Sequence, residues 1–418
     1  MHKATELLNK RIVPALTALS ENTYLSAIRA GMVSVVPMTI IGGLFIIVTF
    51  LPVTGWDKII APYAQLLQVP VTATFGLLSV FVCFSIGYDL GKQLKQEAIV
   101  SGTMATLIFL MIQLKLGAKP DDIAFSMDSL GSKGLFTAVI IALICVRIQK
   151  WFTDKNMVIR LPENVPAVVY ESFLSLTPLF FLVVLFWVIR FVLGVDIDHI
   201  VQTAFKPVVF ALNTLPGILV YAFLVTLLWS VGINGDNAMD AIVAPIFLQF
   251  LAANVEAMTA GQPLPYVTAY GFFTAFVNVG GTGATIALAL VMLNSKEPGY
   301  RKVSRLSLPT QIFQINEPIF FGFPIVLNPI LMVPFILNAL ILTASSYLLM
   351  QWGLIHKPFV NVPWTTPPII GHYLVSGGDW RAAVWGAISI VIAMVIYYPF
   401  AKAAERQRLN KEASPGGA

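Results

Sequence analysis

The acidic residue Glu317 stands in an otherwise apolar part of the sequence. It follows Asn316 and precedes Pro318, and no charged residue comes after it until Lys357. A carboxylate in hydrocarbon costs about 2.5–3.5 kcal/mol on insertion scales, so an acid there indicates a functional site. Pro318 disfavours helical geometry at Glu317, and broken backbone at membrane depth usually lines a cavity. We therefore predict that Asn316 and Glu317 face a ligand-binding cavity. The alternative is that Asn316 caps a helix and Glu317 lies near the cytosolic surface.

Two glycine-containing segments could complete this cavity. Asn234, Gly235 and Asp236 follow an apolar run, and their amides and carboxylate suit a polyhydroxylated ligand. The alternative for them is a helix end followed by the cap of the next helix. Gly281 and Thr282 belong to a glycine cluster that lacks the lysine of a nucleotide-binding loop. We expect a hairpin tip whose amides face the cavity, and the alternative is close helix packing through small residues.

Two other positions could reach the same ligand. Trp364 lies in a proline-rich segment, Val362-Pro363-Trp364-Thr365-Thr366-Pro367, where a regular helix is not possible. Its ring could stack on a sugar, or it could belong to the aromatic belt of the membrane interface. Lys92 and Gln93 stand at the end of an apolar run. They are further candidates for substrate binding, and the alternative is a solvated helix end.

The composition predicts a membrane protein with several spans. The chain has 418 residues, of which 57% are hydrophobic and 11% are charged, whereas a soluble domain has about 25% charged residues. This excludes a soluble enzyme and a nucleic-acid-binding protein. The cysteines Cys83 and Cys145 lie in apolar runs, and the four histidines form no ligand pattern. We therefore predict no metal site and no cofactor.

Uncharged runs long enough to cross a bilayer recur along the whole chain. They are residues 31–51, 70–88, 98–114, 134–151, 172–189, 208–235, 241–255 and 382–400, together with two stretches of 39 residues, 257–295 and 318–356. The fourth run holds Arg147 and Lys150 near its end, and the seventh is short. Glycines and prolines interrupt both long stretches, and interrupted apolar segments are the best sequence indication of a transport site. We predict that each long stretch is one full span joined to a re-entrant or bent piece.

These patterns predict an all-α polytopic membrane protein with about ten transmembrane helices, two re-entrant hairpins and an interfacial amphipathic helix. We predict a five-helix scaffold and dimerisation domain over residues 1–195, an interfacial linker helix over 196–213, and a substrate-binding transport domain over 214–418. The first 25 residues have the pattern of a further amphipathic helix. Segments 3–29, 92–95, 147–160, 296–305 and 402–411 hold 18 of the 26 basic residues. The positive-inside rule then predicts that both termini are cytoplasmic.

Carboxylates, amides, glycines and an aromatic ring together suggest that the ligand is a neutral sugar, since a hydroxyl donates well to a carboxylate. The competing hypothesis is an ion-coupled secondary transporter without chemistry, in which Glu317 or Asp236 would bind a proton or sodium ion.

The chain resembles a known family, the membrane-embedded IIC component of the bacterial phosphoenolpyruvate-dependent sugar phosphotransferase system, in its lactose/cellobiose/chitobiose branch. The resemblance is carried by residues 27–31, 232–235, 280–283, 315–322 and 362–367. It implies ten spans, two re-entrant hairpins and a homodimer made by the first five spans, in a bacterial inner membrane. It also implies a β-linked disaccharide in the second half, with Glu317 at the hydroxyl to be phosphorylated and Trp364 against a sugar ring.

One departure from the family concerns Asn234, where family members often have histidine. Asparagine can donate and accept hydrogen bonds but takes up no proton near neutral pH, which weakens an acid–base role at this position. The resemblance implies a phosphoryl donor on a partner chain, the phosphorylated IIB protein with IIA upstream. We expect IIB to dock on the cytosolic face near the basic segments 147–160 and 296–305.

Overall fold

The structure is a computed structural model, and it describes residues 22–51, 54–117, 123–159 and 167–413. Most of these residues are helical. The helices of the first half are α3 (Thr23–Ser34), α4 (Val36–Thr49), α5 (Trp56–Ile60), α6 (Ala64–Phe75), α7 (Leu78–Gln93), α8 (Ala98–Gln113), α9 (Met127–Leu130), α10 (Leu135–Asp154), α11 (Ala167–Trp187) and α12 (Ile197–Leu212). Those of the second half are α13 (Leu215–Ser230), α14 (Gly235–Thr259), α15 (Thr285–Met292), α16 (Pro298–Ile312), α17 (Glu317–Gly322), α18 (Pro329–Gln351), α19 (Pro368–Val375) and α20 (Trp380–Ala413).

Shorter elements join these helices. The 3-10 turns are η2 (Ala61–Tyr63), η3 (Ser132–Gly134) and η6 (Thr282–Ala284), and the π-helical turns are η4 (Val188–Val192) and η5 (Phe272–Val277). One small antiparallel hairpin, β1 (Leu114–Leu116) and β2 (Ile123–Phe125), was not expected from the sequence. The predicted N-terminal amphipathic helix lies, up to residue 21, outside the described residues. The basic residues Lys3, Lys10, Arg11 and Arg160, which the positive-inside rule assigns to the cytoplasmic side, lie outside them as well.

The predicted helical membrane architecture is confirmed. In the described part of the chain, eight helical segments are long and apolar enough to cross a membrane, and α13 adds a ninth as part of a bent pair with α12. Helix α8 is a shorter apolar helix. These ten segments correspond one to one to the ten runs found in the sequence. The bend between α12 and α13 is 81°, so α12 departs from the direction of the span that follows it.

The ends of two spans differ from the sequence prediction. The second begins before Pro70, which lies inside α6, and the helical segment extends from Lys58 to Gln93. The short run 241–255 lies within a helix of 25 residues. This helix starts early because the side-chain oxygen of Asn234 accepts a hydrogen bond from the amide of Asn237, at 2.9 Å, and so caps its polar first turn.

Both long uncharged stretches contain broken helices. In the first, η5 is followed by a turn with positive φ at Gly280, Gly281 and Gly283, and α15 begins only after this turn. In the second, the six residues of α17 precede the full-length helix α18. The segment from Phe272 to Met292 is the most buried of the membrane-spanning candidates, since 83% of an 18-residue apolar window within it is buried. The broken backbone therefore lies within protein, as hydrocarbon requires.

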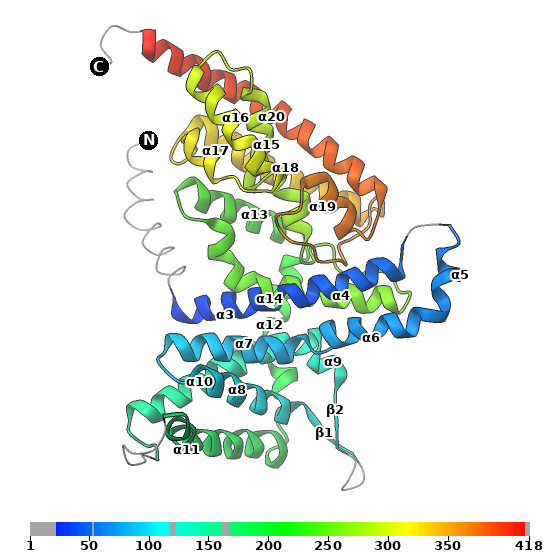
Figure 1. Ribbon diagram of the computed structural model, residues 1–418, viewed down its shortest axis with the longest axis vertical. Helices are drawn as coiled ribbons and strands as arrows, with labels where there is room; N and C mark the ends of the chain where they lie inside the picture. The colour runs from blue at the N-terminus through cyan, green and yellow to red at the C-terminus, as the bar shows by residue number, and fades with distance from the viewer. Residues whose placement is uncertain (1–21, 52–53, 118–122, 160–166, 414–418) are drawn as a thin grey trace.

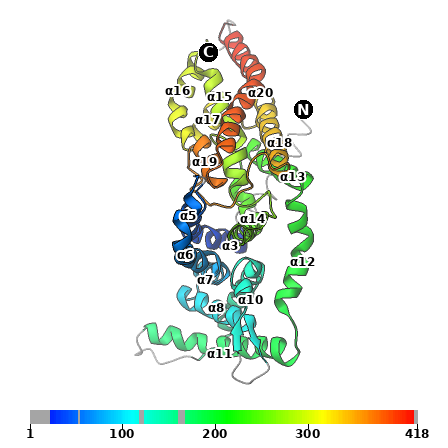
Figure 2. The same ribbon diagram turned by 90° about the vertical axis from the view of Figure 1, so that its right-hand side faces the viewer.

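The two halves of the chain form the two ends of an elongated molecule. Helices α6, α7, α8 and α10 lie at one end and α15 to α20 at the other (Figure 1). Helix α12 runs along one edge from the level of α11 to that of α13 (Figure 2). Helix α14 packs on α3, and Asn361 donates a hydrogen bond to Oγ1 of Thr39 at 2.7 Å, so the halves touch through defined contacts. The boundaries of the three predicted domains remain a prediction.

Candidate functional site

The carboxylate of Asp236 joins three segments of the second half. It accepts hydrogen bonds from Nε1 of Trp229 at 2.8 Å, from Nδ2 of Asn278 at 3.1 Å and from Oγ1 of Thr282 at 2.5 Å. Trp229 lies at the end of α13, Asp236 in the first turn of α14, and the other two in the glycine-rich turn between η5 and α15. Hydrogen bonds to a charged acceptor are the stronger ones. Asp236 therefore holds the glycine-rich turn against the junction of α13 and α14.

The turn that carries Glu317 rests on the same glycine-rich turn. Nδ2 of Asn316 donates to the carbonyl oxygen of Thr282 at 3.2 Å. Gly281 has φ +104°, and a Cβ atom there would collide with the side chain of Asn316. Glycine is therefore needed for both the backbone conformation and the close approach. The turn that holds Gly281 and Thr282 is therefore in contact with Asn316, the neighbour of Glu317. That these residues face one ligand cavity remains a prediction.

Helix α17 positions Glu317 at its first turn, followed by Pro318. Ile319 and Phe320 bury the opposite face of this short helix, whereas Glu317 itself is exposed. Asn316 is the N-cap residue of α17, but its side chain makes no cap hydrogen bond and bonds to Thr282 instead. The protein thus holds the start of α17 in place and leaves the carboxylate of Glu317 accessible. The position of Glu317 relative to the cytosolic surface remains a prediction.

Gln314 connects this turn to the segment of Trp364. Its Nε2 atom donates to the carbonyl oxygens of Thr274 in η5 and Thr366, each at 3.1 Å. Trp364 lies two residues before Thr366, and its side chain is exposed. Sequence reasoning missed Gln314. The available signal was a second polar residue close to Asn316 and Glu317, but its bonds to two distant segments are visible only in the folded chain.

Four other predicted residues are not part of this contact network. Asn234 caps α14, and a Cβ on the buried Gly235 would collide with the carbonyl oxygen of Val225, so both serve the helix junction. The alternative from the sequence was a helix end at Gly235 followed by a cap from Asp236 or Asn237. The structure has a helix junction here, but with the cap at Asn234 and with Gly235 as the first residue of α14. Lys92 and Gln93 are exposed at the end of α7, which packs on α3, α8 and α10 at the other end of the molecule.

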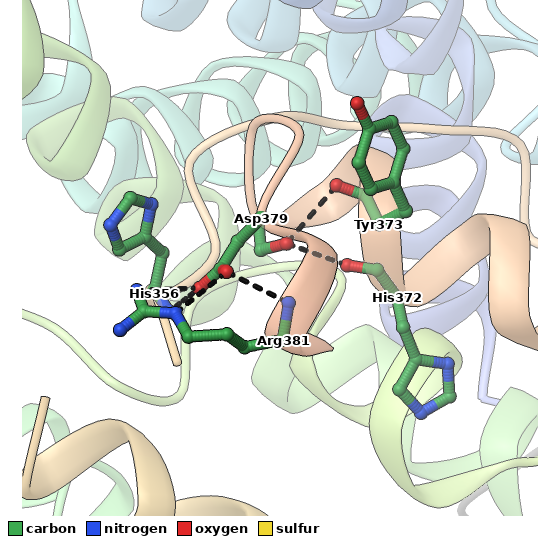
Figure 3. A network of polar contacts seen from close by, with 6 residues as sticks. His356, His372, Tyr373, Asp379 and Arg381 are labelled. Atoms are coloured by element: carbon green, nitrogen blue, oxygen red, sulfur yellow. Dashed lines mark hydrogen bonds and ion pairs between the residues drawn. The ribbon is translucent and has the colours of Figure 1, made fainter. Parts of the chain in front are cut away.

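A separate cavity of about 370 Å³ lies beside the turn between α19 and α20. It is lined by Phe50, Met258, His356, Phe359, Gly377, Gly378, Asp379, Trp380 and Arg381. Asp379 holds this region together by accepting hydrogen bonds from the backbone of His356 and from Arg381 (Figure 3). None of the predicted site residues lines this cavity. Among the described residues, no group of three or more histidine, cysteine or acidic side chains could hold a metal ion.

The two broken helical stretches contact each other next to the accessible carboxylate of Glu317, inside a bundle of several membrane spans. Such an arrangement is typical of a membrane transporter for a polar solute. Comparison with known proteins identifies the family within this class of transporters. The family model described as "Phosphotransferase system, EIIC" matches residues 29–339. The chain belongs to this family, the EIIC permeases of the phosphotransferase system. The comparisons give no support to an ion-coupled carrier.

Similar proteins cover almost the whole chain. The cellobiose-specific EIIC component of Geobacillus stearothermophilus is 35% identical, with 99% of this chain and 96% of that protein covered. The lichenan permease IIC component of Bacillus subtilis is 34% identical, with the same coverage. The crystal structure of the transporter ChbC, the IIC component from the N,N′-diacetylchitobiose-specific phosphotransferase system, matches with a TM-score of 0.90 and 34% identity. That match covers 99% of this chain and 100% of ChbC.

Proposed function

We propose that this permease imports a β-linked disaccharide, of the cellobiose, chitobiose or lactose class, and that the sugar is phosphorylated as it enters. The similar proteins are named for cellobiose, lichenan and N,N′-diacetylchitobiose. The observation that carries the proposal is the link between the turn of Glu317 and the segment of Trp364 through Gln314. An accessible carboxylate and an exposed aromatic ring on connected segments are the groups that bind a sugar hydroxyl and a sugar ring.

In the proposed mechanism Glu317 accepts a hydrogen bond from the hydroxyl that will be phosphorylated. It orients this hydroxyl toward the phosphoryl donor and takes its proton as a general base. The phosphoryl group passes from the donor to the hydroxyl oxygen, and the charged product cannot return through the membrane. Phosphoryl transfer depends mainly on positioning, which the contacts of Asn316 and Thr282 supply to Glu317.

The proposed donor is a phosphorylated IIB protein, itself phosphorylated by IIA. A relative of this chain is the lactose-specific EIICB component of Streptococcus mutans, at 31% identity; the match covers 96% of this chain and 72% of that protein. Helix α16 offers three exposed cations, Arg301, Lys302 and Arg305, for docking the donor. We propose that both termini are cytoplasmic and that the first half forms a homodimer. Charge reversal at Arg301 and Lys302 that left coupling to IIB intact would remove this docking assignment.

The experiment that tests the function uses purified protein in proteoliposomes, with phosphorylated IIB and radiolabelled cellobiose, N,N′-diacetylchitobiose or lactose. We expect sugar phosphate to form from one of these sugars only when phosphorylated IIB is present. Accumulation of unmodified sugar in response to a proton or sodium gradient, without the donor, would overturn the proposal.

The role of Glu317 has its own test. Glu317→Gln keeps the shape of the side chain and loses the base, so the rate of sugar phosphate formation should fall by about 10²–10⁴-fold. Sugar affinity should change much less, because the amide oxygen can still accept a hydrogen bond. A phosphorylation rate near that of the wild type would exclude the base role.

A further inference from the structure

The orientation of the Gln314 side chain is determined by its partners. Both groups that contact Nε2 are backbone carbonyl oxygens, of Thr274 and Thr366. A carbonyl oxygen can only accept, so the nitrogen of the amide must face these two groups. Both N–H bonds of Gln314 are thereby used, and only the oxygen Oε1 remains to bind anything else.

Oε1 of Gln314 has an unsatisfied hydrogen-bonding capacity. The side chain is buried, and Oε1 finds no hydrogen-bond partner among the residues that the structure describes. A buried acceptor left in this state is destabilising. The backbone of Gln314 is also strained, since its φ is +66°, a region that residues other than glycine rarely adopt. Strained residues that the surrounding structure holds in place cluster at ligand-binding sites.

We propose that Gln314 is a specificity-determining residue whose Oε1 accepts a hydrogen bond from one hydroxyl of the sugar. The proposal rests on the proposed function and extends it to the residue that links the turn of Glu317 to the segment of Trp364. Because Nε2 is held by Thr274 and Thr366, Oε1 is pre-organised before the sugar arrives. The ligand group must be a donor, which a hydroxyl is and a sugar ring oxygen is not. A site built to pair with a particular hydroxyl discriminates against sugars that lack it.

The test combines a variant with a series of sugars that each lack one hydroxyl. The affinities of wild-type protein and of Gln314→Met for the parent disaccharide and for its monodeoxy analogues are measured by calorimetry on the purified full-length protein. Methionine has a similar length but neither donates nor accepts strongly. We expect Gln314→Met to bind the parent sugar about tenfold more weakly. The wild type should bind one of the analogues more weakly than the parent sugar by a similar factor. Gln314→Met should bind this analogue and the parent sugar with equal affinity.

A matched control is available in the same segment. Gln311 is fully buried, and neither atom of its amide has a hydrogen-bond partner among the described residues. Gln311→Met should leave sugar affinity and the rate of phosphorylation at wild-type values. Gln314→Leu replaces Gln314→Met if the latter does not yield folded protein, since it removes the same acceptor.

The outcomes separate this inference from the proposed function. If removing each hydroxyl lowers the affinity of the wild type and of Gln314→Met by the same factor, no hydroxyl bonds to Oε1 and the inference is overturned. If the wild type binds none of the disaccharides and forms no sugar phosphate, the proposed function itself fails.

Discussion

Oγ1 of Thr282 lies 2.5 Å from Oδ2 of Asp236, a contact between residues 46 positions apart in the sequence. Thr282 in turn accepts, through its carbonyl oxygen, the hydrogen bond from Asn316. The carboxylate in the first turn of α14 is thus connected by two bonds to the turn that carries Glu317. Asp236 therefore acts in the structure as a support for the turn of Glu317, the proposed general base, and the carboxylate of Asp236 is already hydrogen-bonded to groups of the protein.

Asp236→Asn should destabilise the protein by about 1–3 kcal/mol, because an amide nitrogen would replace one of the two carboxylate oxygens and face donors there. These donors are Asn278 if the nitrogen takes the place of Oδ1, or Trp229 and Thr282 if it takes the place of Oδ2. The measurement is thermal unfolding of the purified protein in detergent. Trp229→Phe provides a graded comparison, since it removes only one of the three hydrogen bonds. Equal stability of Asp236→Asn and the wild type would show that the carboxylate does not support the turn.

Gly281→Ala should abolish sugar phosphorylation. An alanine there would collide with Asn316 and would need a φ of +104°, so the turn of Glu317 must move. Gly261→Ala is the control, because Gly261 also has positive φ, at +65°, but no described atom lies within 4 Å of the place that a Cβ atom would take there. That variant should lose only about 1 kcal/mol of stability and keep its activity. Similar activities of the two variants would contradict the proposed contact role.

Trp364→Ala should raise the KM for the disaccharide about tenfold or more and change kcat little, if its ring binds the sugar in the ground state and the transition state alike. Trp352→Ala is the matched control, since both tryptophans are exposed, at 58% and 66%. The measurement is initial-rate phosphorylation with phosphorylated IIB. If both variants keep the wild-type KM, Trp364 belongs to the interfacial belt and not to the sugar site.

Acid should weaken the turn between α19 and α20 through Asp379. Burial alone would raise the pKa of Asp379, but hydrogen bonds from the Arg381 side chain and from the backbone amides of His356 and Arg381 lower it below its ordinary value of 3.8. A lowered pKa in the folded state stabilises the protein above the unfolded pKa, and this contribution is lost as pH falls through the lower folded value.

We therefore expect Asp379→Asn to unfold at a lower temperature than the wild type at neutral pH. The difference in Tm should shrink as the pH falls below about 4, the range where an unperturbed aspartate takes up its proton. Thermal unfolding of both proteins between pH 7 and pH 3 provides the measurement. A difference that is the same at every pH would show that the charge of Asp379 is not what stabilises this turn.

Much of the fold could be predicted because hydrophobicity along a chain is a local property. A segment without charges and of sufficient length must form a helix in a bilayer, so ten such runs predicted ten helices. The limits of individual helices were less well predicted. Pro70 was expected at the start of a span but lies inside α6, and the cap at Asn234 extends α14 toward its N-terminus. Such limits depend on single hydrogen bonds and on neighbouring helices.

The sequence by itself determined the class of protein. It also indicated candidate site residues, since an acid beside asparagine and proline in an apolar run is costly unless it has a function. Only the tertiary structure decided which of these residues meet. Asp236, Thr282 and Asn316 are joined in one network, whereas Lys92 and Gln93 stand at the end of α7, outside this network. Gln314 became visible only in the fold, because hydrogen bonds between segments 40 and 52 residues apart leave no periodic signal in a sequence.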